Sequence, residues 1–240
     1  HARSVREALK LRRHIHLEPR VQGLQPAAAS RRFPSYLAPA MTQLPELPLT
    51  LSRQEIRKMI RQRRRALTPE QQQEMGQQAA TRMMTYPPVV MAHTVAVFLS
   101  FDGELDTQPL IEQLWRAGKR VYLPVLHPFS AGNLLFLNYH PQSELVMNRL
   151  KIHEPKLDVR DVLPLSRLDV LITPLVAFDE YGQRLGMGGG FYDRTLQNWQ
   201  HYKMQPVGYA HDCQLVEKLP VEEWDIPLPA VVTPSKVWEW

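Results

Sequence analysis

The sequence is poor in cysteine and contains no long hydrophobic run. A single cysteine, Cys213, excludes an intramolecular disulfide and favours a reducing compartment, so we expect a cytoplasmic protein. No segment reaches the length of a membrane span, and the N-terminus lacks the apolar core of a secretory signal. With 240 residues, 44% of them apolar, the chain can still build a substantial core in one large or two small domains.

Acidic residues are scarce at the start of the chain. Residues 1–40 contain eight Lys or Arg and two Asp or Glu, whereas the rest contains 21 basic and 22 acidic residues. The net charge of +5 therefore comes from this segment, and the body of the protein gives no reason to expect a nucleic-acid partner. Prolines interrupt every short apolar run there, so we expect residues 1–48 to be a disordered or non-native extension. Met41 is a candidate internal start, with residues 1–40 as a leader or an upstream reading error.

Two capped helices are expected to open the folded part, residues 49–240, which we interpret as a single α/β domain. Ser52 and Glu55 can form a capping box for a helix over 52–67. Thr68 can cap a second helix that ends before Pro87.

Extended and helical patterns then alternate. Strand, helix and strand are expected at 94–100, 108–117 and 120–123, an order that implies a right-handed crossover and a parallel sheet. We expect residues 140–168 to be a loop. Together the patterns predict an α/β three-layer sandwich with a mostly parallel central sheet flanked by helices. Further strands are expected at 134–139, 169–173, 207–210 and 230–233.

Glycines are few, and four of the 11 lie between Arg184 and Arg194. This stretch follows an apolar run at 170–176 and precedes residues 192–199, which can be helical. A strand, a glycine loop and a helix N-terminus expose backbone N–H groups to an anion, and glycine leaves room for a phosphate. The spacing fits neither the P-loop nor the G-x-G-x-x-G pattern, so a tight turn without a ligand stays an alternative. Asp193 follows the loop, where a carboxylate can hold a cation beside phosphate.

Arginines recur on one face of the first helix, at positions 53, 57, 61 and 64. Such a face is usually only solvated. No acidic residue lies between Arg57 and Glu70 to neutralise it, however, and a nucleotide or polyanion partner would do so.

Three further groups of polar residues are weaker candidates. Asp102, Glu104 and Asp106 follow a strand, where ligands of open sheets bind, but helix starts also favour carboxylates. His153 and Glu154 fall below the usual ligand count of a metal site. A nucleophilic pair of His211 and Cys213 lacks an orienting third group, so a buried or edge cysteine is the favoured interpretation.

The segment from Leu175 to Asp193 resembles the signature of the 5-formyltetrahydrofolate cyclo-ligase family. The resemblance runs from about Leu51 to the C-terminus and includes the basic first helix, Glu104 and Asp225. It implies an enzyme that uses ATP and Mg²⁺ to close 5-formyltetrahydrofolate to 5,10-methenyltetrahydrofolate, releasing ADP and phosphate. It also implies small-molecule substrates, no membrane or nucleic-acid partner, and a monomer.

The resemblance further assigns roles to residues. Arg184 and Asp193 are implied to be catalytic, and Asp193 and Asp225 to hold Mg²⁺. The implied folate-binding residues are Leu99, Glu104, Met187, Gly188, Gly189, Gly190 and Phe191. The implied ATP-binding residues are Arg53, Gln54, Arg57, Arg184, Leu185, Gly186, Met187, Gly188, Gly189, Gly190, Phe191 and Tyr192.

Phe191 departs from the family pattern, which often has tyrosine there, so its side chain can only stack or pack. Two alternative functions are kept. One is a sugar-phosphate isomerase or a CoA-transferase-like enzyme, which would need no ATP. The other is a nucleotide- or RNA-binding module that uses the arginine-rich helix, whose affinity would fall steeply with salt.

Overall fold

The structure, a computed structural model, describes residues 51–240, and the extension predicted for residues 1–48 lies outside them. Helix α3 (Arg53–Arg65) begins after Ser52, whose side chain forms the predicted capping box with Glu55. Helix α4 (Pro69–Thr85) begins after Thr68 in the same way. Both predicted helix starts are therefore confirmed. They could be predicted because each cap depends on residues only three positions apart.

The centre of the molecule is an eight-stranded sheet. In spatial order its strands are β13 (Val237–Glu239), β12 (Ala230–Val232), β10 (Gln205–Tyr209), β7 (Val170–Thr173), β1 (Thr94–Ala96), β2 (Arg120–Leu126), β3 (Leu134–Tyr139) and β6 (Val162–Leu163). The five inner strands, from β12 to β2, run parallel, while the strands at both edges are antiparallel. The predicted helical crossover between the parallel strands β1 and β2 is confirmed.

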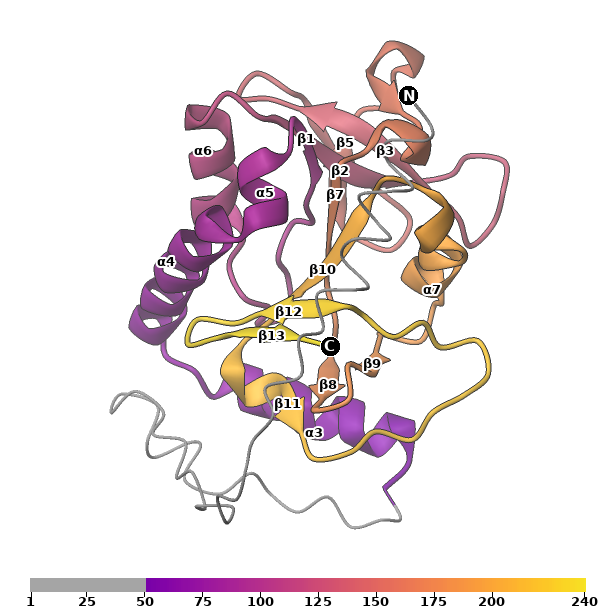
Figure 1. The fold of residues 1–240 in the computed structure, drawn as a ribbon. Helices are drawn as coiled ribbons and strands as arrows, with labels where there is room; N and C mark the ends of the chain where they lie inside the picture. Colours follow the sequence, from indigo (N-terminus) through magenta and orange to yellow (C-terminus); the bar gives the residue numbers. More distant parts are fainter. Residues whose placement is uncertain (1–50) are drawn as a thin grey trace, which may run out of the picture.

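Helices cover both faces of this sheet (Figure 1). Helices α4, α5 (Pro87–Met91) and α6 (Gln108–Arg116) lie on one side, and the short α7 (Phe191–Leu196) lies on the other. A separate apolar cluster fills each interface, as expected for a three-layer sandwich. No helix within residues 51–240 has the length and apolar character needed to cross a membrane.

Helix α3 crosses one end of the molecule beside a second, three-stranded sheet (Figure 1). Ile56 and Ile60 of α3 are buried in a third apolar cluster, which includes residues of that sheet. This packing places the arginines of α3 next to the segment that carries the glycine loop. The strands of the second sheet are β11 (Leu215–Val216), β8 (Ala177–Asp179) and β9 (Arg184–Leu185).

Two sequence expectations were wrong. The strand expected at 120–123 is longer, because β2 continues through Pro124 to Leu126. The last residue of β2 that pairs with β1 is Tyr122, so Pro124 pairs only with β3.

Residues 140–168 are not simply a loop. They contain a hairpin of β4 (Leu145–Met147) and β5 (His153–Pro155), the strand β6, and the 3-10 turns η2 (Val159–Asp161) and η3 (Leu165–Arg167).

A tertiary contact explains why this hairpin escaped sequence analysis. The Glu154 carboxylate accepts hydrogen bonds from the Leu126 backbone N–H and from Asn148 Nδ2, both at 3.0 Å. The hairpin is thus tied to the end of β2 by one partly buried acceptor, and its own residues show little apolar alternation.

Candidate active site

A cavity of about 620 Å³ opens where β1, β2 and β7 end. Ligands of open α/β sheets bind at this edge, because successive loops diverge there. The cavity wall includes every predicted site residue except Leu185, which is buried in β9, and Asp225, which lies just outside. The structure thus brings together segments that are more than 130 residues apart in the chain, from Arg53 to Asp193.

The glycine loop lies between two arginines. Arg57 Nε donates to the Gly186 carbonyl at 2.7 Å, and Arg194 Nη1 donates to the Gly189 carbonyl at 2.8 Å. Gly188 has φ +106°, a conformation that residues with a side chain rarely adopt. A Cβ at Gly188 would also lie 3.7 Å from the Arg57 guanidinium carbon, so the bare backbone leaves that charge open to the cavity.

Arg184 and Asp193 form an ion pair across the base of this loop. Arg184 Nη2 donates to Asp193 Oδ1 at 2.6 Å, and only 3% of the Arg184 side chain is exposed. The Ile226 backbone N–H also donates to Asp193 Oδ1, at 3.3 Å. Asp193 therefore lies beside the residue that follows Asp225.

Arg53 and Asp225 form a second ion pair, with two contacts of 2.6 and 3.0 Å. Two parallel N–H···O bonds between a guanidinium and a carboxylate fix both groups. Each predicted metal ligand is thus paired with a predicted phosphate-binding arginine. No cluster of three or more metal-binding side chains occurs among residues 51–240. Two neighbouring carboxylates nevertheless fit Mg²⁺, which takes one or two carboxylates and fills its octahedron with phosphate and water.

Glu104 is 8% exposed and lines the cavity beside the apolar wall formed by Phe98 and Leu99. Burial raises its pKa to about 7, while a hydrogen bond from the Phe101 backbone N–H and the charge of Arg64 act in the opposite direction. Burial also raises the pKa of Tyr192, which stays a neutral phenol. The Glu104 carboxylate thus has its proton equilibrium near neutral pH.

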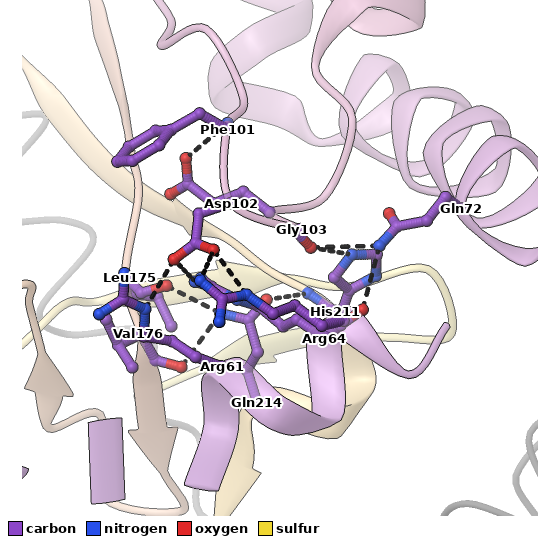
Figure 2. Close-up of polar contacts among 12 residues, drawn as sticks. Arg61, Arg64, Gln72, Phe101, Asp102, Gly103, Leu175, Val176, His211 and Gln214 are labelled. Carbon is purple, nitrogen blue, oxygen red and sulfur yellow. Dashed lines mark hydrogen bonds and ion pairs between the residues drawn. The ribbon is translucent and has the colours of Figure 1, made fainter. Parts of the chain in front are cut away.

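Most arginines of α3 have an acidic partner within the chain, contrary to expectation. Asp102 accepts hydrogen bonds from Arg61 Nε at 2.6 Å and Arg65 Nε at 2.8 Å, and it lies 3.7 Å from Arg64 Nη2 (Figure 2). Asp102 follows β1 in the fold, so no local pattern on the helix reveals it. Of the four arginines expected to need a polyanion, Arg61 and Arg64 share Asp102, and Arg53 is paired with Asp225, so that interpretation is wrong for these three.

The weaker candidates also find structural explanations. Asp106 accepts from the Gln108 backbone N–H at 3.0 Å and serves the start of α6. Burial raises the pKa of the Cys213 thiol to about 12 and lowers that of His211 to about 4, so this pair supplies neither a thiolate nor an imidazolium. Glu154 supports the hairpin, as described above.

Sequence analysis missed several residues of the cavity wall. Trp224 is 63% exposed there, and the only sequence signal for it was its place next to Asp225. Residues of the β4–β5 hairpin, namely Asn148, Leu150, Ile152, His153 and Glu154, also line the cavity.

Comparisons with known proteins identify the family and the fold of this chain. A model of the 5-formyltetrahydrofolate cyclo-ligase family matches residues 50–234. The 5-formyltetrahydrofolate cyclo-ligase of Haemophilus influenzae is 53% identical over 179 residues, covering 75% of this chain and 96% of that protein. The protein of the same name from Mycolicibacterium smegmatis is 31% identical, covering 77% and 95%. The solved structure of Aquifex aeolicus 5,10-methenyltetrahydrofolate synthetase has a TM-score of 0.68 at 28% identity, covering 79% of this chain and 93% of that one.

Proposed function

Since this chain belongs to the 5-formyltetrahydrofolate cyclo-ligase family, it converts 5-formyltetrahydrofolate into 5,10-methenyltetrahydrofolate, and we propose that it does so with ATP and Mg²⁺ in the cavity described above. The observation that supports this proposal best is the pair of Arg–Asp contacts around the glycine loop. They gather the charges that a metal–nucleotide complex needs beside an apolar cavity large enough for a second substrate.

The proposed chemistry solves a leaving-group problem. The oxygen of an N-formyl group leaves poorly, so the γ-phosphoryl group of ATP is first transferred to it, with release of ADP. N10 of the folate then attacks the activated carbon and loses its proton, the carbon–oxygen bond breaks, and phosphate departs. Phosphoryl transfer depends mainly on positioning and charge neutralisation, so no covalent nucleophile from the protein is required.

We assign the triphosphate to the glycine loop and the start of α3. Gly186 to Gly190 offer backbone to the phosphates, while Arg53, Arg57 and Arg184 supply positive charge. Burial and the neighbouring Arg53 lower the pKa of Arg57, which indicates that cations are crowded at this end of the cavity. Gln54, Met187 and Tyr192 complete the wall on this side, while Leu185, which the sequence also predicted to bind ATP, is buried behind it in β9.

Asp193 and Asp225 would hold Mg²⁺, which supplies charge neutralisation and orientation of the phosphates when bound. Both acids are paired with arginines, so binding is an exchange of partners. With both ligands bound, Arg53 and Arg184 would contact phosphate oxygens, and the two carboxylates would contact the metal. The number of opposite-charge contacts is thereby conserved, and Mg²⁺ and ATP should bind much better together than singly.

We assign the folate to the end of the cavity formed by Leu99, Glu104 and Phe191. A charged carboxylate can accept paired N–H bonds from the pterin ring, and the two apolar side chains can pack on its faces. Phe191 lacks the hydroxyl that many relatives offer, so it contributes packing alone.

The test is a spectroscopic assay with purified protein. Methenyl absorbance should appear when 5-formyltetrahydrofolate, ATP and Mg²⁺ are all present. Chelation should stop its appearance, and added Mg²⁺ should restore it. Absence of product with all three present contradicts the ligase proposal, and product formation without ATP contradicts its coupling to phosphoryl transfer. A monomer, expected from sequence, is checked by light scattering, and the cytoplasmic location stays a prediction.

The RNA-binding alternative loses support from the structure. Arg53, Arg61, Arg64 and Arg65 of α3 face acidic side chains of this chain. Engaged guanidinium groups make fewer phosphate contacts, and the steep salt dependence of nucleic-acid binding scales with those contacts.

A further inference from the structure

A loop after β1 carries Glu104 and rests on helix α3 through Asp102 and Gly103. Both residues have positive φ angles, +53° for Asp102 and +74° for Gly103. The Asp102 carboxylate faces Arg61, Arg64 and Arg65 together. Since one negative charge meets three positive charges, the cluster keeps an excess of positive charge beside the loop that carries Glu104. Figure 2 shows Asp102 with Arg61 and Arg64.

Arg64 is the buried member of this cluster. Its side chain is 0% exposed, and none of its three guanidinium nitrogens has a hydrogen-bond partner among residues 51–240. Burying a guanidinium without using its donors is costly, and a purely structural arginine would use them. Burial lowers the pKa of Arg64, and the charge of Glu104 is the largest influence in the opposite direction.

Backbone contacts already hold the loop in place. Gln72 Nε2 donates to the Gly103 carbonyl at 3.2 Å, and His211 Nε2 lies 3.2 Å from the same oxygen. A Cβ on Gly103 would lie 3.2 Å from the Arg64 Cβ, so the loop packs directly on this arginine. The Arg64 charge is not needed for this anchoring.

Glu104, by contrast, needs a nearby cation. Its burial favours the neutral acid, which cannot accept two N–H bonds as a carboxylate can. The groups that face it differ in sign and effect. Arg64 of α3 favours its charged form, Asp102 of its own loop opposes it, and Tyr192 of α7 is neutral. His211 is neutral as well, because burial lowers its pKa to about 4.

We propose that Arg64 is a positioning residue for folate recognition, which acts from behind the loop by favouring the charged form of Glu104. This role rests on the proposed function, because it assigns Glu104 to the folate. Arg64 itself touches neither substrate nor nucleotide.

The experiment measures binding of 5-formyltetrahydrofolate without ATP, by calorimetry between pH 5.5 and 9. In the parent protein the Kd should rise as pH falls through about 7, because Glu104 becomes protonated. In Arg64→Met the midpoint should move upward by about one pH unit, which weakens binding at pH 7 by about fivefold. Arg64→Lys, which keeps the charge, should retain the parent midpoint.

Two further variants test the electrostatic origin of the effect. Asp102→Asn should move the midpoint downward, because Asp102 raises the pKa of Glu104. In a Glu104→Gln background, Arg64→Met should cause no further loss of folate affinity. A structural role would instead lower the melting temperature of each variant and leave the midpoint unchanged.

The proposal is overturned if folded Arg64→Met binds folate with the parent midpoint. The proposal is equally overturned if Arg64→Met still lowers folate affinity in the Glu104→Gln background. If Arg64→Met does not fold, Asp102→Asn is the deciding variant. An unchanged or upward pH midpoint of folate binding in Asp102→Asn rejects the proposal. Failure of the proposed function has a different signature, namely a parent protein that makes no methenyl product from ATP and folate.

Discussion

Arg184 and Asp193 hold the two ends of the glycine loop together, with Nη2 and Oδ1 2.6 Å apart. Arg184 lies in β9 and Asp193 in α7, so the contact closes the loop as a single ring of chain around the proposed phosphate site. The same two groups are the proposed partners of phosphate and metal. Loop geometry and the proposed ligand binding therefore depend on one ion pair. A substitution that removes the charge but keeps the shape can distinguish the structural role of this pair from its role in ligand binding.

Asp193→Asn should abolish turnover far more than folate binding. The amide keeps the shape and can still accept from the Ile226 N–H, but it loses the charge that holds the metal. We expect kcat to fall at least about 100-fold, with folate Kd changed less than about threefold. Product absorbance and calorimetry measure the two quantities. Asp158→Asn, in an exposed ion pair with Arg160, is the control and should retain full activity. Equal loss of turnover and folate binding in Asp193→Asn indicates a structural role.

Arg53→Ala should raise the KM for Mg-ATP by about tenfold or more, because it removes a phosphate contact and leaves Asp225 without its partner. The KM for folate should stay within about twofold. The matched control is Lys58→Ala, which removes an exposed positive charge from the same helix and should leave both constants unchanged. If the two variants behave alike, only the overall charge of α3 matters. Steady-state kinetics at varied Mg-ATP distinguish these outcomes.

Gly188→Ala should remove most ATP-dependent activity, since a side chain there meets both a φ of +106° and the Arg57 guanidinium. Gly118→Ala is the control for backbone strain. Its φ is +74°, but nothing lies within 4 Å of an added Cβ. It should cost roughly 1 kcal/mol of stability and keep its activity. Denaturant unfolding and nucleotide binding of both variants test this, and full ATP affinity in Gly188→Ala would place the phosphates elsewhere.

Glu104 should make the protein less stable as pH rises from about 4.5 to about 7. Its pKa is raised from 4.5 to about 7 in the folded state, so the folded chain holds a proton that the unfolded chain has released. The stabilising contribution is complete below pH 4.5 and is lost by about pH 7, at a cost on the order of 3 kcal/mol.

Glu104→Gln removes this titration, so it should gain stability over the parent protein between pH 4.5 and 7 and lose folate affinity. The difference between the two proteins is the useful quantity, because the depressed pKa of His211 changes both equally as pH falls from 6.5 toward 4. Melting temperatures measured at pH 4.5 to 8 give this difference, and a constant offset contradicts the elevated pKa.

The sequence by itself determined the features that rest on neighbours in the chain. The capping boxes of Ser52 and Thr68, the strand before the glycine loop, and the loop itself depend on residues a few positions apart. The family signature is also contiguous, from Leu175 to Asp193, so the order of amino acids alone indicates the reaction class.

Only the tertiary structure decided which charges meet. Asp225 reaches Arg53 across 172 positions, and Asp102 reaches Arg61 across 41, so no helical periodicity shows that these arginines have partners. The burial of Arg64 is likewise invisible on a helix whose polar residues suggest a solvated face. Ion pairing and burial depend on distance in space and on the exclusion of water, and the packing of α3 against the loops fixes both.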